Sequence, residues 1–532
     1  MASADGAGTV AADRDQLLAG LTQAVGAEHL FTDLEERRFY STDLYSEGAT
    51  CAAAVRPLDR ESLARAVGLA TAAGYAVIPR GGGLTYVGGY TPDREETVAV
   101  DVSALNRIVE INETDMYITV EAGVTWKQIY DALKPLGLRL PYFGTFSGAK
   151  ATVGGGLSNG ALFLGTGRYG SAADIVLGLQ VALADGTLVR TGQASFEGGK
   201  PFFRTYGPDL TGLFVHDSGA LGIKTEATLR MMRMPRETDF LSFGFETSDA
   251  AIAAACEVAR CELAEDNYIM DPVKTQLALS GGDLASDARI LANVVKDAGG
   301  LMRGLKAGAD MVMAGKKFAN HVHSLNVTCA ARSRAALEAD MAEIAAIAER
   351  FGGQVLPNSI PKANRSNLFP PVNGVIGPEG DRWIALNAKV PHSDAQRIYD
   401  AAEAIIARHR DELDARGVKV SRLLSLMSNH AFSYEPVFNW KDAWLPQHKR
   451  AAEPSHLAKF KEPAADIETR ALVTKVRTEL VDMFATFGAA SSQIGRTYHY
   501  LSSLKPETRR LVEDLKRMVD PKGLMNPGAL GF

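Results

Sequence analysis

The chain has 532 residues, of which 46% are hydrophobic and 23% charged, and its formal net charge is −6. This length predicts about two to four domains, and the composition is typical of a soluble globular protein. The acidic balance argues against a dedicated nucleic-acid binder. No apolar run reaches the roughly eighteen residues that a membrane span needs.

Four cysteines, at positions 51, 256, 261 and 329, have a spacing that fits neither a zinc site nor a disulfide framework. The N-terminal segment MASADGAGTVAADRDQ contains acidic residues and lacks the apolar region of a secretory signal. We therefore expect a cytoplasmic protein with reduced thiols.

The first part of the chain predicts short strands and helices that flank two glycine-rich loops. Helical spacing over residues 61–74 ends at a glycine, and a strand-like run follows at 75–79. Further on, Asp185-Gly186 is a strong hairpin signal. The remaining predicted elements are strands at 97–103, 108–111 and 117–123, a helix at 125–137 and a hairpin at 174–192.

From about Asp239 the pattern changes to three alternations of a strand and a long helix. These alternations predict a second, α+β domain with helices on one face of a sheet. We expect one further strand run at 423–438, and helices again near the C-terminus. The alternating pairs are 240–246 with 249–264, 323–331 with 334–352, and 382–390 with 394–413, and the last helices are 468–488 and 506–519.

The stretch Ile78–Tyr90, IPRGGGLTYVGGY, contains five glycines among thirteen residues. Consecutive glycines let backbone N–H groups converge with no Cβ in the way, which suits a pyrophosphate. Thr85 would add a hydroxyl donor and Arg80 a cation. The alternative is a glycine turn without a ligand, but a second such loop at 152–160, TVGGGLSNG, favours two ligand-binding loops.

A third glycine pattern, GTGRYG at 165–170, matches the G-x-G-x-x-G of dinucleotide-binding folds. That pattern has meaning only between a strand and a helix. Here an apolar, strand-like run follows it, so we reject a Rossmann fold.

Five segments occur in the order and spacing of the vanillyl-alcohol oxidase and p-cresol methylhydroxylase (PCMH) flavoproteins, and the chain resembles that family. They are PRGGGLT (79–85), VEAGVTW (120–126), the run from 151 to 170, DLTGLFVHDSGALGIKTEATL (209–229) and DPKGLMNPG (520–528). The resemblance implies an α+β fold with a two-subdomain PCMH-type FAD-binding domain and an α+β cap. The implied boundaries are 1–238 for the FAD-binding domain, 239–470 for the cap and 471–532 for a C-terminal segment that returns to the FAD domain.

The resemblance also implies which residues contact FAD, and these lie in the two loops, beside the adenine and in the C-terminal signature. They are Pro79, Arg80, Gly81, Gly82, Gly83, Leu84, Thr85, Tyr86, Gly89, Thr152, Val153, Gly154, Gly155, Ser158, Asn159, Gly160, Tyr169, Gly170, Gly222, Ile223 and Asn526.

Some relatives attach FAD covalently through a His after the first glycines or a Cys near the second loop. Here the first position is Leu84, no His occurs between His29 and His216, and no Cys occurs between Cys51 and Cys256. Covalent attachment from either loop is therefore excluded, while linkage to a His or Tyr of the cap stays open.

By resemblance, the chain is an FAD-dependent oxidase or dehydrogenase in which hydride passes from a substrate carbon to flavin N5. The phenol-oxidising branch has an Arg-Thr-His element near the C-terminus, and GRTYHYL at 495–501 is similar. Arg496 and Tyr498 would hold a phenolate, because a cation favours the deprotonated form. The alternative is that Arg496 pairs with a carboxylate while Tyr498 packs. Tyr86 falls next to the phenol-binding Tyr of that branch.

The branch's usual acidic residue before the second glycines is Thr152 here, so proton transfer needs another group. His430 and Tyr434, four residues apart, would share one face of a straight strand, and His499 is a further candidate. An ordinary hydrogen-bonded His430 is the competing explanation.

The hydroxy-acid branch often has a metal-binding His-x-Gly-Asp-Gly-Asn-x-His run, which this sequence lacks. The nearest cluster, His321-Val-His323, is better explained by sheet packing, and we expect no metal.

The leading hypothesis is oxidation of an alcohol or benzylic carbon on an aromatic substrate, including para-hydroxylated phenols. The alternatives are a D-2-hydroxy-acid dehydrogenase of the lactate or glycolate type, which would bind the carboxylate through Arg496, and a non-redox flavoenzyme of the alkyl-glycerone-phosphate synthase type. A flavin-binding protein without chemistry is the non-enzyme alternative. We expect O2 or another carrier as electron acceptor, a homo-oligomer such as a dimer, and no nucleic-acid partner.

Overall fold

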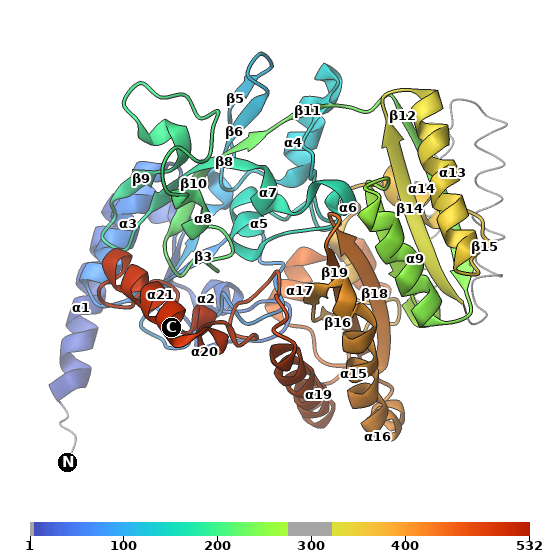
Figure 1. The fold of residues 1–532 in the computed structure, drawn as a ribbon. Coiled ribbons are helices and arrows are strands. Elements are labelled where there is room, and N and C mark those ends of the chain that lie inside the picture. The colour runs from blue at the N-terminus through green and yellow to red at the C-terminus, as the bar shows by residue number, and fades with distance from the viewer. Residues whose placement is uncertain (1–4, 275–321) are drawn as a thin grey trace.

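The computed structural model describes residues 5–274 and 322–532, with side chains from residue 14 onward. Figure 1 shows the N-terminal half of the chain on one side and the sheet of the second half on the other. Of the C-terminal helices, α20 (Tyr500–Ser503) and α21 (Pro506–Val519) lie beside the N-terminal half, whereas α19 (Ile467–Thr486) packs against the helix at Ala395–Arg408. Within the described ranges, no helix combines the length and the apolar character needed to cross a membrane.

The first sheet has four strands in the order β1-β2-β4-β3, and β2 and β3 both run parallel to β4. Helix α3 packs against it and begins at a capping box, in which Asp59 accepts from the backbone N–H of Ser62. The strands are β1 (Leu30–Phe31), β2 (Ala53–Val55), β3 (Ala76–Arg80) and β4 (Thr97–Asp101), and the helices of this part are α1 (Asp5–Val25), α2 (Leu34–Tyr40) and α3 (Arg60–Ala72).

The second sheet has five antiparallel strands in the order β5-β6-β10-β8-β9. Helix α5 carries the second glycine loop and lies against β10. The strands are β5 (Ile108–Asn112), β6 (Tyr117–Glu121), β8 (Val176–Ala182), β9 (Leu188–Arg190) and β10 (Ile223–Arg230), with a small pair of β7 (Leu138–Arg139) and β11 (Met232–Arg233). The helices are α4 (Trp126–Leu133), α5 (Val153–Asn159), α6 (Thr166–Tyr169), α7 (Ala172–Ile175) and α8 (Leu210–Leu213).

The second half of the chain forms one large antiparallel sheet in the order β15-β12-β14-β13-β18-β19-β16, with β17 also paired to β19. Helices α9, α13 and α15 pack against it. The strands are β12 (Glu237–Phe245), β13 (Asp266–Met270), β14 (His323–Ala331), β15 (Gln354–Val355), β16 (Arg382–Ala385), β17 (Ala388–Pro391), β18 (Lys419–Met427) and β19 (Ala431–Trp440). The helices are α9 (Ser248–Arg260), α13 (Arg334–Arg350), α14 (Ser359–Ser366), α15 (Ala395–Arg408), α16 (Arg410–Ala415), α17 (Pro446–Ala451) and α18 (Pro454–Leu457).

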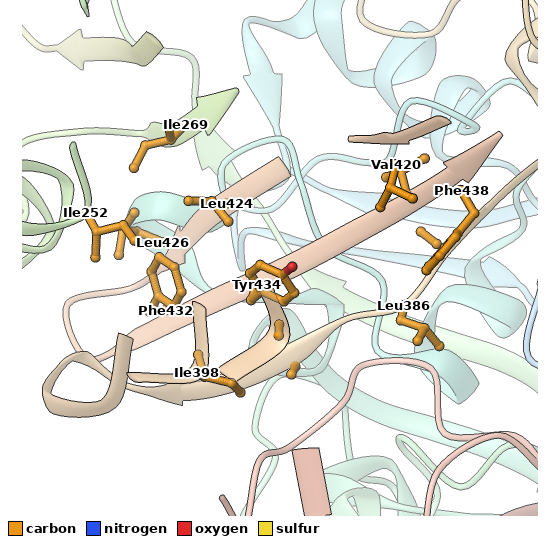
Figure 2. Packing of buried hydrophobic residues seen from close by; sticks show 14 of the residues in the cluster. Ile252, Ile269, Leu386, Ile398, Val420, Leu424, Leu426, Phe432, Tyr434 and Phe438 are labelled. Carbon is orange, nitrogen blue, oxygen red and sulfur yellow. The ribbon is translucent and has the colours of Figure 1, made fainter. Parts of the chain in front are cut away.

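The core of this cap lies between the sheet and its helices. Figure 2 shows Leu424 and Leu426 of β18 and Phe432 and Tyr434 of β19 among the side chains of this core, with Ile398 of α15. Since the sheet buries one face against helices, its other face is left to meet the FAD-binding half.

The C-terminal segment contains α19 (Ile467–Thr486), α20 (Tyr500–Ser503) and α21 (Pro506–Val519), and its tail returns to the first sheet. Met525 forms a parallel bridge with Val77 of β3. Lys516, which is buried, donates to the carbonyls of Ala220 and Met525. These contacts fix the tail beside β3, the strand that leads into the first glycine loop.

The predicted α+β class is confirmed, but two predicted strands are wrong. The run 382–390 forms two strands, β16 and β17. The run 423–438 is not a single strand, because β18 and β19 form a hairpin with a turn at 428–430. Ser428 in that turn has φ of 51°, a left-handed conformation that ends the strand. The straight-strand geometry expected for His430 and Tyr434 therefore does not exist.

Candidate functional site

A cavity of about 340 Å³ lies between the two glycine loops, the cap sheet and the C-terminal segment. This volume is in the range of small-molecule sites, about 300–1,000 Å³. The FAD-binding half contributes both loops, the cap contributes Trp383 and Glu435, and the C-terminal segment contributes Ser492 and Gln493. The cavity therefore joins parts of the chain that are more than four hundred residues apart.

Most residues that the resemblance assigns to FAD line this cavity. They are Pro79, Arg80, Gly81, Gly82, Gly83, Leu84, Thr85, Tyr86, Thr152, Gly154, Gly155, Ser158, Asn159, Gly160, Gly222 and Ile223. Five assigned residues are not part of the lining, namely Gly89, Val153, Tyr169, Gly170 and Asn526.

The glycines are required because the two loops pack directly on each other. A Cβ at Gly81 would lie 2.3 Å from Thr152 Oγ1, and one at Gly82 would lie 2.3 Å from the carbonyl oxygen of Lys150. In the first loop, Thr85 Oγ1 is buried and has no hydrogen-bond partner in the described part of the chain. A buried hydroxyl at a glycine-lined wall fits the polar pyrophosphate of FAD, since buried polar groups are nearly always hydrogen-bonded.

Arg80 shapes the first loop through contacts within the protein. Its guanidinium donates to the carbonyl of Thr42 at 2.5 Å and to Gln447 Oε1 at 2.5 Å. It also lies 4.7 Å from the ring centre of Phe39. Because these partners occupy its donors, Arg80 holds the loop in place as well as adding positive charge near the cavity.

Asn526 connects three segments of the chain beside the cavity. Its side-chain amide donates to the carbonyls of Gly89, at 2.7 Å, and Ser218, at 2.6 Å, and its φ of 43° is left-handed. The first loop, the segment before β10 and the tail therefore meet at one side chain. Its distance from the cavity lining agrees with a supporting role.

The cap side of the cavity has an aromatic wall. The rings of Tyr86 and Trp383 meet edge to face with centroids 5.3 Å apart, an arrangement that aromatic pairs prefer. The Tyr86 hydroxyl accepts from Gln493 Nε2 at 3.0 Å, and burial raises the pKa of this phenol above its ordinary value. Lys274 Nζ lies 5.9 Å from the Trp383 ring centre.

Glu435 is a cavity residue that the sequence pattern did not single out. Successive side chains of β19 point to opposite faces, so Tyr434 enters the cap core and donates to Glu403, while Glu435 faces the cavity. Burial raises the pKa of the Glu435 carboxyl, and Lys274 and Lys389 oppose that shift. A lone Glu within the apolar strand run FSYEPVF is the signal that would have found it.

The predicted catalytic residues other than Tyr86 do not line this cavity. His430 lies exposed in the β18–β19 turn, and His499 is exposed and pairs with Asp482 at 2.7 Å. Arg496 donates to the backbone carbonyls of Gly88 and Pro527, so its guanidinium supports the first loop.

Tyr498 comes closer to the cavity than these three. Its hydroxyl accepts from the backbone N–H of Asn387, a cavity residue, at 2.7 Å. The residues predicted to act around Arg496 therefore do not form one group. His499 lies on the surface, Arg496 supports the first loop, and Tyr498 lies behind the cavity wall.

Of the two histidines considered as metal ligands, the structure describes one. His323 begins β14, and His321 lies outside the described residues. Among the residues that the structure describes, no three His, Cys, Asp or Glu side chains are grouped so that they could hold a metal ion.

The fold and the paired glycine loops are those of PCMH-type FAD-binding proteins. Residues 51–192 match the family model of the FAD binding domain, which confirms the predicted cofactor. The structure of p-cresol methylhydroxylase with substrate bound superposes with a TM-score of 0.72 at 18% identity, over 98% of this chain and 97% of that chain. At this identity the likeness concerns the fold.

Two curated relatives are similar in sequence over part of the chain. The mitochondrial D-lactate dehydrogenase (cytochrome) 1 of Saccharomyces cerevisiae is 33% identical over 186 residues, which is 35% of this chain and 30% of that protein. The glycolate oxidase subunit GlcD of Bacillus subtilis is 30% identical over 244 residues, which is 46% of this chain and 50% of that protein. The chain thus matches 30% to 50% of the length of these relatives.

Proposed function

We propose that this protein is an FAD-dependent oxidoreductase that removes a hydride and a proton from a small organic substrate. The observation that carries the proposal is the single cavity that runs from both glycine loops to the cap sheet. FAD bound to the loops would supply the two-electron acceptor. The cap residues would bind and orient the substrate at the other wall.

The position of each residue at the cavity determines the role that we propose for it. Gly81 and Gly82 allow the loops to approach the pyrophosphate, and the free hydroxyl of Thr85 would donate to it. The cap sheet excludes water from the reacting carbon. Glu435 and Lys274 bring one negative and one positive group to the cavity, so that a polar end of the substrate finds a partner.

The first choice of substrate is an alcohol or benzylic carbon on an aromatic ring. Tyr86, Trp383 and Met270 line the cavity, and the perpendicular rings of Tyr86 and Trp383 form an aromatic corner against which a substrate ring can pack. The Oε1 of Gln493 is buried without a partner in the described residues and lies at the same wall, where it would accept from a substrate hydroxyl.

A D-2-hydroxy acid is the second candidate. The two relatives favour it, since they are a D-lactate dehydrogenase and a glycolate oxidase subunit. Lys274 would bind the carboxylate, because it reaches the cavity and no ion pair within 4 Å is found for it among the described residues. This role was expected of Arg496, whose donors are held by backbone carbonyls. With either substrate, O2 or another carrier would finally accept the electrons that the substrate loses. We also expect a homo-oligomer.

The deciding experiment mixes the purified protein anaerobically with 4-hydroxybenzyl alcohol and, separately, with D-lactate. We expect a yellow protein with the absorption of oxidised flavin that the aromatic alcohol bleaches faster. Faster bleaching by D-lactate would select the second candidate, and a colourless protein that FAD does not reconstitute would contradict the whole proposal. Acid precipitation of the yellow protein would show whether FAD is attached covalently.

A further inference from the structure

Lys389 of β17 is a buried lysine that reaches toward the cavity. Its Nζ forms a hydrogen bond with Ser492 Oγ and lies 3.2 Å from Asn387 Oδ1. Ser492 and Asn387 both line the cavity, while Lys389 lies directly behind them. The main chain of Lys389 is fixed on both sides, by Ser433 of β19 and by mutual hydrogen bonds with Ala490.

This lysine has no acid in direct contact. Within the described residues, no carboxylate forms an ion pair with Nζ at 4 Å or less. Lysines are almost never fully buried unless they are paired. Burial lowers the pKa of the Lys389 ammonium to about 7, and the Glu435 charge opposes this shift. Near neutral pH, Nζ therefore exists in both protonation states.

We propose that Ser492 and Lys389 form a proton relay, in which Ser492 Oγ takes the proton of the substrate hydroxyl and passes its own to Lys389 Nζ. The inference rests on the proposed function, since it needs a substrate alcohol. It applies equally to an aromatic alcohol and to a 2-hydroxy acid. Ser492 is the catalytic residue, because it faces the substrate, and Lys389 is a positioning and proton-accepting residue behind it.

The step balances without any further reactant. The O–H bond of the substrate breaks as an O–H bond forms on Ser492, and the original hydroxyl proton of Ser492 moves to the lone pair of Nζ. The C–H bond breaks as a hydride leaves with its two electrons, which FAD would accept when bound, and a C=O bond forms. An alcohol thus becomes a carbonyl compound and neutral lysine becomes an ammonium ion, while FAD, when bound, would supply the two-electron acceptor.

Three titratable groups face the relay from neighbouring elements. Glu435 of β19 favours the ammonium form of Lys389. His216, in the segment before β10, is kept neutral because burial lowers its pKa to about 4, and Lys389 adds to that effect. The Tyr498 hydroxyl touches the backbone of Asn387, and burial raises the pKa of this phenol. The pKa of Lys389, which burial lowers to about 7, lies inside the window from pH 6 to 8.

The first test is the anaerobic rate of flavin reduction by 4-hydroxybenzyl alcohol between about pH 5.5 and 9. Since neutral Lys389 is the acceptor, we expect the wild-type rate to rise about tenfold per pH unit and to level off above pH 7. In Lys389→Met and in Ser492→Ala, the rate should no longer rise with pH in this way. Its value at high pH should be about 10²- to 10⁴-fold lower, which is the usual contribution of general-base catalysis.

Two further variants separate a relay from a structural cation. Lys389→Arg keeps a positive charge that does not titrate, so a relay predicts no recovery, whereas a structural cation predicts near-normal rates. Ser491→Ala is the matched control for Ser492→Ala, because Ser491 bonds Asn387 but neither lines the cavity nor touches Lys389. We expect Ser491→Ala to retain the pH step, and bound FAD per chain reports correct folding of each variant.

The second test does not depend on turnover. In FAD-loaded protein carrying ¹³Cε-labelled lysine, the resonance missing from Lys389→Arg should titrate near pH 7, and Ser492→Ala should shift its midpoint. A midpoint close to the ordinary lysine value of about 10.4 would overturn the relay. Reduction of the flavin with an unchanged pH step in Lys389→Met would overturn the relay alone. Bound FAD that neither this alcohol nor D-lactate reduces would overturn the proposed function, and the relay with it.

Discussion

Nη2 of Arg80 lies 2.5 Å from Oε1 of Gln447, and the same Gln447 side chain donates to the carbonyl of Gly82 at 3.1 Å. Gln447 belongs to α17, after the cap sheet, whereas Arg80 and Gly82 belong to the first glycine loop. One amide therefore satisfies a buried cation and a backbone carbonyl of the loop. It makes the shape of the FAD-binding loop depend on the second half of the chain.

Replacing Gln447 with Ala should therefore weaken both the fold and cofactor binding. The change leaves the buried Arg80 guanidinium with an unpaired donor, which typically costs about 1–3 kcal/mol. We expect a lower free energy of unfolding in urea and faster loss of FAD on dilution. Gln396→Ala is the control, because Gln396 bonds only the exposed Asp400 on α15. Equal stability of the two variants would show that the contact between the loop and α17 is unimportant.

Gly82→Ala should abolish or strongly reduce FAD binding. The new Cβ would lie 2.3 Å from the carbonyl oxygen of Lys150, so the two loops would have to separate. Gly374→Ala is the matched control, since a Cβ there meets nothing within 4 Å. The measurement is the ratio of flavin absorbance to protein absorbance after reconstitution with FAD. A normal ratio for Gly82→Ala would contradict the close packing of the loops.

Stability should fall as the pH drops below about 6.5, because two buried histidines are held neutral. Burial lowers the pKa of His448 to about 3 and that of His216 to about 4. The unfolded chain binds these protons below pH 6.5 and the folded chain does not, so the free energy of unfolding decreases by up to about 1.4 kcal/mol per pH unit per histidine.

The variant His448→Gln tests this dependence. Nδ1 of His448 accepts from the backbone N–H of Leu445 at 3.1 Å, a bond that a glutamine oxygen can accept in its place. Urea unfolding between pH 4.5 and 7 should show a shallower slope for the variant than for the wild type. Parallel slopes would mean that His448 does not contribute to the acid sensitivity.

Glu435→Gln and Tyr434→Phe should act on different properties, although the two positions are adjacent. Glu435 faces the cavity, so Glu435→Gln should change the rate of flavin reduction and move its pH dependence to lower pH, because Lys389 loses a neighbour that raises its pKa. Tyr434→Phe removes the hydrogen bond to Glu403 at 3.0 Å and should lower stability by about 1 kcal/mol. Stopped-flow reduction and urea unfolding of both variants make the comparison. A similar effect of both on the rate would contradict the assignment of faces on β19.

Local sequence patterns were sufficient to predict the class of fold and the glycine loops that bind FAD. Runs of glycine occur after β3 and at the start of α5. Such runs allow backbone to approach a ligand or another backbone closely, wherever the rest of the chain lies. Alternating strands and helices after Asp239 likewise predicted a sheet covered by helices. The hairpin at 428–430 was missed because strand-forming residues continue through the turn with only Ser428-Asn429 to interrupt them.

The sequence by itself thus determined the glycine loops, the α+β class and the absence of a His or Cys anchor in either loop, because these depend on residues close together in the chain. Only the tertiary structure decided which polar residues meet in the cavity. Lys389 and Ser492 are 103 residues apart, and Arg80 and Gln447 are 367 apart. Such pairs form when separate elements pack. Arg496 and His499 carry suitable chemistry in sequence, yet packing turns one toward backbone carbonyls and the other toward solvent.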